Sequence, residues 1–267
     1  MKVNLRGQHD LGEIVGFAYR IYSANFAPLF VIAAITAPMQ MLIAIADRQI
    51  DNRDVADTVV GLLQVPAALI TVVAVAALIS AVHNITAGEK AEPGQSLDVG
   101  LARFWDLLTS GLLAGVLTFA AALAFPFLAI YWLIDRDASI DGRRDWRLVL
   151  IPLALLFYLS IRWAFVAQAV VIERKKRWPA LDASADTVRG YWWRTLGIII
   201  VIALIQLGPI SLATASALGP PLLEATVTAF VGALVLPFAV AAQILLYYDL
   251  KSRKQPDAIS AAPITDP

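Results

Sequence analysis

Long apolar runs, separated by short polar stretches, dominate the pattern of hydrophobic and polar positions along this chain. A helix needs roughly 20 apolar residues to cross a hydrocarbon core about 30 Å thick, and six runs reach that length. They cover residues 26–46, 58–83, 107–134, 148–172, 195–218 and 222–248. Transmembrane β-strands would instead alternate in segments of about ten residues. The pattern therefore predicts an all-α fold, a polytopic membrane helix bundle with six spans.

Three shorter segments, one before each odd-numbered span, carry apolar residues at helical spacing. They cover residues 10–23, 96–106 and 180–193, and each has a tyrosine or tryptophan towards its end. Amphipathic helices of this kind lie in the membrane interface, with their aromatic side chains at headgroup level. Because the segments recur at a nearly constant interval, the chain is predicted to contain three parallel repeats, each an interfacial helix followed by a transmembrane hairpin.

Almost the whole chain is assigned to one domain. Residues 1–254 are predicted to form a single integral membrane domain, because an apolar share of 59% and a mean hydropathy of +0.71 leave little for a soluble one. Residues 255–267 are small, polar and proline-containing, which predicts a disordered cytoplasmic tail. No cleavable signal peptide is expected, since the first apolar run follows a charged amphipathic stretch and is long enough to span.

Lysine and arginine favour the cytoplasmic side of a membrane protein, and they are unevenly distributed between the two sides of the predicted bundle. The larger set lies at the N-terminus, in the second and fourth loops and in the tail: Lys2, Arg6, Arg20, Lys90, Arg103, Arg174, Lys175, Lys176, Arg177, Arg189, Arg194, Lys251, Arg253 and Lys254. The smaller set lies in the first and third loops, diluted by aspartates: Arg48, Arg53, Arg136, Arg143, Arg144 and Arg147. Both termini are therefore predicted to be cytoplasmic, in a multi-pass protein of the bacterial cytoplasmic (inner) membrane.

Three segments are similar to one known family. In RWAFVAQAVVIERKKRWPALDASADTVRGYWWRTLGI (162–198) a spanning helix ends in an acidic residue, and a basic loop and an amphipathic helix with tryptophans follow. ILLYYDLKSRK (244–254) carries a tyrosine pair, an aspartate and basic residues, and LGEIVGFAYRIYSANFAPLF (11–30) leads into the first span. These segments resemble the glycerophosphoryl diester phosphodiesterase membrane-domain family. The resemblance implies a membrane architecture over residues 1–255, without the catalytic barrel to which such domains are fused, because the chain has no room for it.

Catalytic and cofactor motifs are absent from the sequence: there is no Gly-x-Ser-x-Gly elbow, no His-Glu-x-x-His zinc helix and no phosphate-cradling Gly-rich loop. An intramembrane enzyme would need a nucleophile and a base at one depth, and no such pair is found. His83, at a predicted helix end, is interpreted as solvated or capping. Aspartates cluster in the loops 47–57 and 135–147, where oxygen ligands suit Mg²⁺ or Ca²⁺, but interleaved arginines favour solvated, self-neutralised loops. We therefore expect no enzyme activity, cofactor or metal.

Arg162 is the one charge deep in a predicted span. About ten residues of helix, at ~1.5 Å each, separate it from the cytoplasmic end of the span at Ile172. A central arginine costs ~2.5–3.5 kcal/mol on insertion scales, so it is expected to have polar partners. Gln206 and Thr118 lie at similar predicted depth. Arg162, Gln206 and Thr118 are therefore a candidate intramembrane polar cluster, either a structural clamp or a site for a ligand or lipid phosphate.

A basic loop is predicted to lie against the cytoplasmic leaflet. It consists of Arg174, Lys175, Lys176 and Arg177, and Trp178 follows it. Anionic lipids attract such residues with roughly 1 kcal/mol apiece near the surface, so all five are candidate lipid-headgroup contacts. The alternative is a topology determinant with no further role. Nucleic acid is not an expected partner, because no basic domain lies outside the membrane plane.

The absence of catalytic motifs, together with the predicted hairpin bundle and interfacial helices, favours a non-catalytic, multi-pass inner-membrane module that binds lipid or partner proteins. Its expected partners are the lipid bilayer, including anionic lipids, and a membrane protein. The alternative is a small transporter or lipid translocator with a polar site near Arg162. That alternative predicts a polar-lined cavity around Arg162, Gln206 and Gln243.

Overall fold

The computed structural model describes residues 10–134, 147–215 and 220–254, and all regular structure within these ranges is helical. The helices are α1 (Leu11–Ala24), α2 (Phe26–Ala34), α3 (Ala37–Gln49), α4 (Arg53–Ala87), α5 (Pro93–Ala102), α6 (Phe104–Ile134), α7 (Arg147–Arg162), α8 (Val166–Val171), α9 (Trp178–Val188), α10 (Trp192–Ala215) and α11 (Pro221–Lys254). Five helices are long and apolar enough to cross a membrane, and α1 with α2, bent by 85°, would make a sixth if the pair counts as one span. The all-α prediction is confirmed, and the helices indicate a multi-pass membrane protein.

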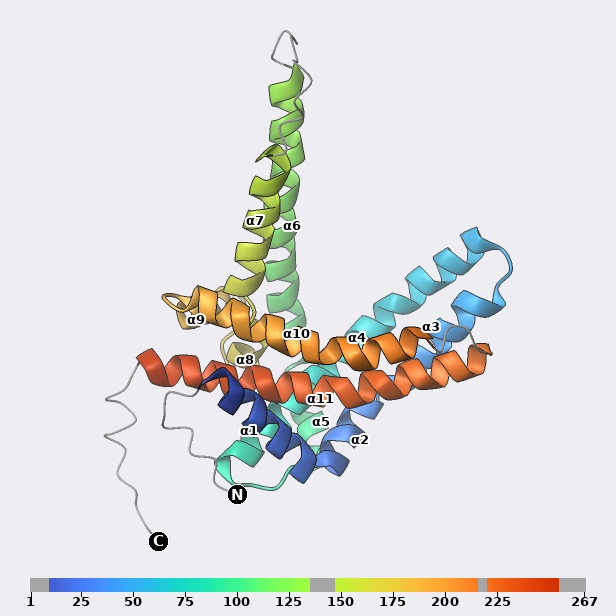
Figure 1. The fold of residues 1–267 in the computed structure, drawn as a ribbon, viewed down its shortest axis with the longest axis vertical. Coiled ribbons are helices and arrows are strands. Elements are labelled where there is room, and N and C mark those ends of the chain that lie inside the picture. The colour runs from blue at the N-terminus through green and yellow to red at the C-terminus, as the bar shows by residue number, and fades with distance from the viewer. Residues whose placement is uncertain (1–9, 135–146, 216–219, 255–267) are drawn as a thin grey trace.

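Three helical hairpins extend from one compact base (Figure 1). The base consists of α1, α2, α5, α8, α9 and the C-terminal halves of α4 and α11, which supply most of the buried apolar core. The hairpins are α3–α4, α6–α7 and α10–α11. The first and third contact each other through α3 and α11, whereas α6–α7 projects away from the rest of the molecule (Figure 1). Only 11% of the apolar window of α6 and 17% of that of α10 are buried, so these helices leave a large apolar surface for lipid.

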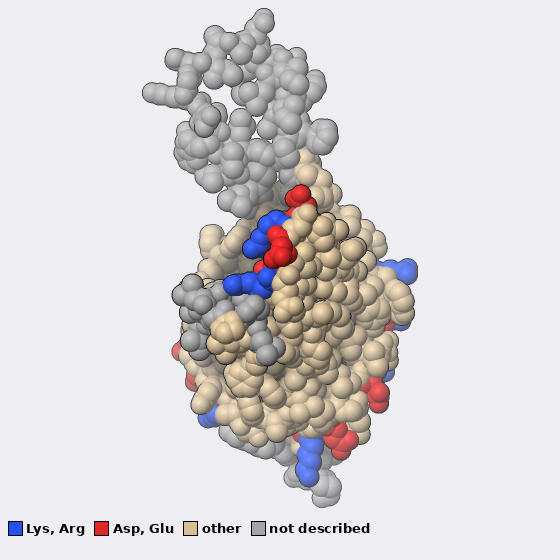
Figure 2. Space-filling model, turned by 90° about the vertical axis from the view of Figure 1, so that its right-hand side faces the viewer, with Lys and Arg blue, Asp and Glu red and all other residues tan. Residues whose placement is uncertain are grey.

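Charged side chains are sparse between the base and the hairpin tips. On the face drawn in Figure 2 uncharged residues dominate, and the charges gather in one cluster and around the outline of the molecule. At the tip of α3–α4, Arg53 Nη1 lies 3.5 Å from Asp47 Oδ1. The long uncharged stretches of α4, α6 and α10 are those expected of helices that cross a bilayer.

The predicted first span, 26–46, is divided in the structure between α2 and α3. Pro38 has no N–H to donate to the carbonyl of Ala34, which interrupts the helical ladder. The N–H and the hydroxyl of Thr36 both donate to the carbonyl of Ala33, at 3.1 and 2.8 Å, and close the break with a tight turn. The apolar run predicts that this segment is long enough to cross the membrane, and Pro38 determines where its helix is interrupted.

The predicted span 148–172 is also divided, between α7 and α8. Residues 163–165 form turns, and α8 then runs into the base with Phe165 and Val170 fully buried. Ser184 of α9, itself fully buried, accepts a hydrogen bond from the N–H of Phe165 and donates one to the carbonyl of Arg162, both at 3.0 Å. The backbone groups released by the break are therefore satisfied by another helix of the base.

Each of the three short segments predicted to lie in the interface is a separate helix that ends in a turn. Helices α5 and α9 lead directly into their hairpins, whereas α2 lies between α1 and the hairpin α3–α4. Asn25 separates α1 from α2, Arg103 separates α5 from α6, and residues 189–191, with Gly190 at φ +85°, separate α9 from α10. The order of a short helix and then a hairpin thus occurs three times along the described chain.

Helix α5 folds back along α4 at very close range. A Cβ on Gly100 would lie 2.7 Å from the carbonyl oxygen of Val73 and 3.3 Å from the Cβ of Ala77. Only glycine leaves room for this approach between the two backbones. The contact fixes α5, and with it the start of α6, against the middle of α4.

Candidate functional site

Three consecutive residues of α11 connect the base-side ends of the three hairpins, and we call them the hub: Tyr247, Tyr248 and Asp249. The hydroxyl of Tyr247 donates to the carboxylate of Glu173, which follows α8. The hydroxyl of Tyr248 lies 2.5 Å from Nδ1 of His83, near the end of α4. Successive residues of a helix are about 100° apart, so one turn of α11 can contact three neighbours in three directions.

Asp249 is the buried charged member of the hub, with a side chain that is 0% exposed. Its Oδ2 accepts from Nε and Nη2 of Arg194 at 3.2 and 3.1 Å, and from Nε of Arg253 at 2.9 Å. Arg194 lies in the first turn of α10 and Arg253 in the last turn of α11. One buried carboxylate with two guanidinium partners ties the two helices of the third hairpin together at the base.

Three donors converge on the carboxylate of Glu173. Besides the hydroxyl of Tyr247, its carboxylate pairs with Nζ of Lys175 at 2.9 Å and with the ammonium of Lys251. Lys251 also lies over the ring of Tyr247, 5.0 Å from its centroid. A polar pocket of about 170 Å³ beside this network contains Asp186 and Lys254 as well. The network is suited to holding helix ends in place.

The backbone of the basic loop 174–177 is held in an unusual conformation. Arg174 and Arg177 adopt positive φ values of 57° and 53°. The N–H of Lys175 donates to the carbonyl of Ala169 at 3.2 Å, and the N–H of Arg177 donates to Oγ of Ser110 in α6 at 2.8 Å. Non-glycine residues in this region cost of order 1–3 kcal/mol each, and such strain clusters at functional positions.

All four basic side chains of the loop are exposed. Lys175 pairs with Glu173, and Nζ of Lys176 lies 3.1 Å from Asp106 of α6. Arg174 and Arg177 make no side-chain hydrogen bond or ion pair within the described part of the chain. Trp178 follows the loop and is 56% exposed. The loop thus presents two uncommitted guanidinium groups beside an exposed tryptophan.

The structure does not bring the candidate cluster of Arg162, Gln206 and Thr118 together. Nη1 of Arg162 donates to the hydroxyl of Tyr158 in its own helix at 3.1 Å, and the hydroxyl of Thr118 donates to the carbonyl of Ala114 at 2.8 Å. No hydrogen bond joins these three described side chains to one another. The sequence-based depth assumed a straight helix to residue 172, whereas the break at 163–165 places Arg162 where α7 meets the base.

The tyrosine that accepts from Arg162 belongs to an aromatic pair. The rings of Tyr158 and Trp192 are stacked, with centroids 6.1 Å apart, and the indole N–H of Trp192 donates to the carbonyl of Tyr158 at 3.5 Å. Gln243, the third member of the cavity expected for a translocator, accepts from Nε2 of Gln168 at 3.4 Å. Arg162 and Gln243 therefore belong to separate polar groups.

Of the two aspartate-rich loops, the structure describes the first, 47–57. In the first, Asn52 caps α4 by accepting from the N–H groups of Asp54 and Val55, at 3.0 and 3.3 Å. No group of three or more His, Cys, Asp or Glu residues with metal-site spacing is found among the described residues. The second loop, 135–147, lies almost entirely outside them.

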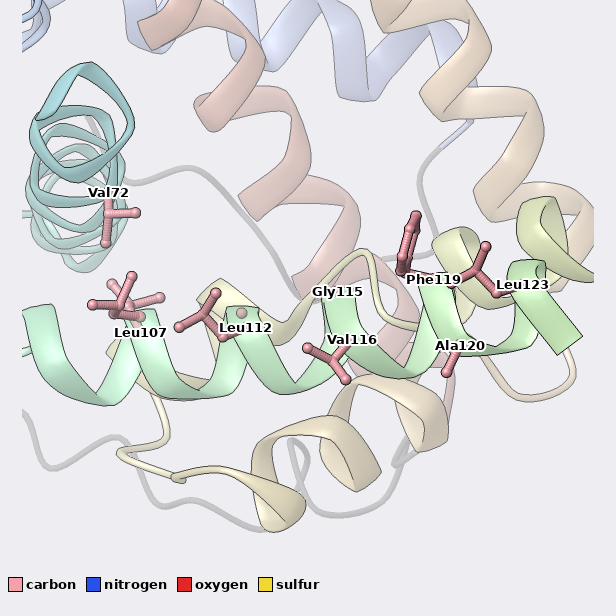
Figure 3. Close-up of a pocket in the computed structure, with 10 residues that line it drawn as sticks. Val72, Leu107, Leu112, Gly115, Val116, Phe119, Ala120 and Leu123 are labelled. Carbon is pink, nitrogen blue, oxygen red and sulfur yellow. The ribbon is translucent and has the colours of Figure 1, made fainter. Parts of the chain in front are cut away.

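An apolar groove of about 520 Å³ follows the exposed face of α6 (Figure 3). Its walls include Val72 of α4 and the α6 residues Leu112, Val116 and Phe119. Gly111 and Gly115 leave open space where a Cβ would stand. The groove offers no charged group to a ligand, so it fits acyl chains or an apolar helix and has no chemistry of its own.

Sequence reasoning missed Ser110, Ser184 and the partners of the hub tyrosines. A single serine in an amphipathic helix gives no signal of its distant partner. The two segments that carry the family resemblance in their polar residues, 162–198 and 244–254, do meet in space, through Glu173 with Tyr247 and Arg194 with Asp249. No family model, no curated protein and no solved structure matches this chain.

Proposed function

We propose that this chain is a non-catalytic, multi-pass module of the bacterial inner membrane that binds anionic phospholipid through the basic loop 174–177. The observation that carries the proposal is the pair of uncommitted guanidinium groups of Arg174 and Arg177, held on a strained backbone beside exposed Trp178. Guanidinium groups bind phosphate oxygens with paired hydrogen bonds. Tryptophan is enriched at headgroup level.

The strain supports a binding role over a topology determinant alone. Positive charge near a span suffices to orient it, and that role needs no particular backbone conformation. Here two arginines adopt left-handed φ values, and the loop is anchored to α6 through Ser110 and Asp106. A loop that is built in this way holds its cations at a defined distance from one another.

Removing the two free guanidinium groups is expected to reduce bound anionic lipid. We expect the double variant Arg174→Gln, Arg177→Gln to retain about thirtyfold less phosphatidylglycerol than wild type in native mass spectrometry, since each of the two cations contributes roughly 1 kcal/mol. The double variant Arg48→Gln, Arg53→Gln removes the same charge at the tip of α3–α4, and is the matched control. Equal retention by the two double variants would show that the loop has no specific role.

The proposal includes an orientation in which the base and both termini face the cytoplasm. The native chain has no cysteine, so single cysteines can be labelled without background. We expect a membrane-impermeant maleimide to label Asp51→Cys in intact cells, and Asp182→Cys only after permeabilisation. Both positions are exposed. The opposite labelling pattern would invert the orientation and remove the loop from the inner leaflet.

The repeated order of a short helix and a hairpin supports the rest of the proposal. In this reading α1, α5 and α9 belong to three related units, and α1 and α9 lie in the cytoplasmic interface. Membership of the glycerophosphoryl diester phosphodiesterase membrane-domain family is proposed on the same grounds. A partner membrane protein would find its contact surface on the exposed face of α6.

A further inference from the structure

A second pocket, of about 450 Å³, lies in the elbow where α1 meets α2. The two helices are bent by 85° at Asn25. The turn that follows α4 closes the other side of the pocket. Its apolar lining consists of Ile21, Ala24, Pro28, Ile85 and Ala91, and its charged lining of Arg20, Glu89 and Lys90. The pocket is thus apolar on some walls and charged on others.

Local structure fixes both sides of the elbow. Nδ2 of Asn25 donates to the carbonyl of Ile21 at 3.0 Å, which holds the end of α1. On the other side α4 ends at Gly88, which adopts φ 92°. The N–H groups of Gly88 and Glu89 donate to the carbonyls of Ile85 and Asn84 at 3.1 and 2.9 Å. This glycine cap ends α4 and so determines the position of Glu89 and Lys90, which follow it.

The three charged side chains of the pocket are exposed. Nε of Arg20 donates to the carbonyl of Gly16 at 3.4 Å, and the guanidinium lies 4.5 Å from the centroid of the Phe17 ring. These contacts orient Arg20 and leave its two Nη groups available. Neither Arg20, Glu89 nor Lys90 forms an ion pair with a residue in the described part of the chain. The pocket therefore offers two cations and one carboxylate to a ligand.

We propose that this pocket binds the headgroup of a phospholipid with a primary amine, such as phosphatidylethanolamine. Its phosphate would bind Arg20 and Lys90, its ammonium would donate to Glu89, and the first acyl carbons would pack on Ile21 and Pro28. The arrangement of charges in the pocket complements this headgroup. A purely anionic headgroup would leave Glu89 without a partner. A trimethylammonium group carries the same charge but has no N–H to donate to the carboxylate.

Competition among headgroups tests the proposal. The full-length protein in detergent is incubated with equal amounts of phosphatidylethanolamine, phosphatidylcholine and phosphatidylglycerol of identical acyl composition, and bound lipid is read by native mass spectrometry. Wild type is expected to retain phosphatidylethanolamine over phosphatidylcholine. Glu89→Gln is expected to lower that preference about tenfold, the equilibrium effect of one charge-assisted hydrogen bond. Glu89→Lys is expected to shift retention towards phosphatidylglycerol.

Glu92→Gln is the matched control, because Glu92 is an exposed acid close in sequence that does not line the pocket. The proposal is overturned if wild type does not distinguish phosphatidylethanolamine from phosphatidylcholine, or if Glu89→Gln behaves like Glu92→Gln. The site is separate from the basic loop. Loss of the preference in the Arg174→Gln, Arg177→Gln variant would also overturn it, whereas failure of the loop proposal alone leaves the Glu89 effect in place.

Discussion

Asp249→Asn is expected to lower the free energy of unfolding by about 3 kcal/mol, because it removes the negative charge of a buried carboxylate that two guanidinium groups share. Breaking a buried ion pair by removing one partner costs about 3–5 kcal/mol, and the partial exposure of Arg194, whose side chain is 26% exposed, favours the lower end. The amide preserves the shape of the side chain. Reversible unfolding in mixed detergent micelles measures the change.

Asp98→Asn is the control for that measurement. Asp98 is exposed on α5, and no ion pair involves it among the described residues. A substitution of this kind changes stability by less than about 0.5 kcal/mol. If the two variants unfolded alike, the hub would not stabilise the base, and Asp249 would have to be assigned another role.

Gly100→Ala is expected to destabilise the protein by about 1–3 kcal/mol, the usual cost of inserting a methyl group into a filled space. The new Cβ would meet the carbonyl oxygen of Val73 at 2.7 Å. That atom belongs to the backbone in the middle of α4, so no side-chain rotation relieves the contact. Either α5 moves away from α4, or α4 bends. Thermal unfolding in detergent measures the loss.

Gly94→Ala, in the same helix, provides the comparison. No atom outside the local chain lies within 4 Å of the Cβ that it would add. Alanine has a higher helix propensity than glycine, so this variant is expected to unfold at the wild-type temperature or slightly above it. A loss of stability in Gly94→Ala equal to that in Gly100→Ala would mean that the close approach to α4 is not the cause.

The sequence predicts the helical segments well, because length and apolarity alone determine which segments can cross a bilayer. It predicts interruptions less well. The span 26–46 is broken at Pro38, where the proline explains the interruption once the structure is known, but the break after Arg162 depends on Ser184, a residue of another helix that satisfies the released backbone groups. The end of α7 at Arg162 cannot be predicted from the sequence without that tertiary contact.

The candidate sites divide in the same way. The basic loop can be recognised from four adjacent cations, because a local run of charge needs no tertiary information. The hub cannot, because His83, Glu173 and Arg194 are far apart in the sequence and only the packed base brings them to one turn of α11. The elbow pocket is also a tertiary feature, made where the turn after α4 packs against the bend between α1 and α2.

The α6–α7 hairpin has a mechanical consequence for the whole molecule. Each of its two helices is connected to the base by a turn. One turn lies at Arg103 before α6, and the other covers residues 163–165 after α7. A hairpin connected to the base by two turns can change its tilt while the contacts of the hub are retained. Membrane helices tilt to match bilayer thickness. We expect this hairpin to tilt further in a thinner bilayer, and the basic loop, which is anchored to α6 at Ser110, to move with it. The headgroup site proposed for the basic loop would thereby be coupled to bilayer thickness.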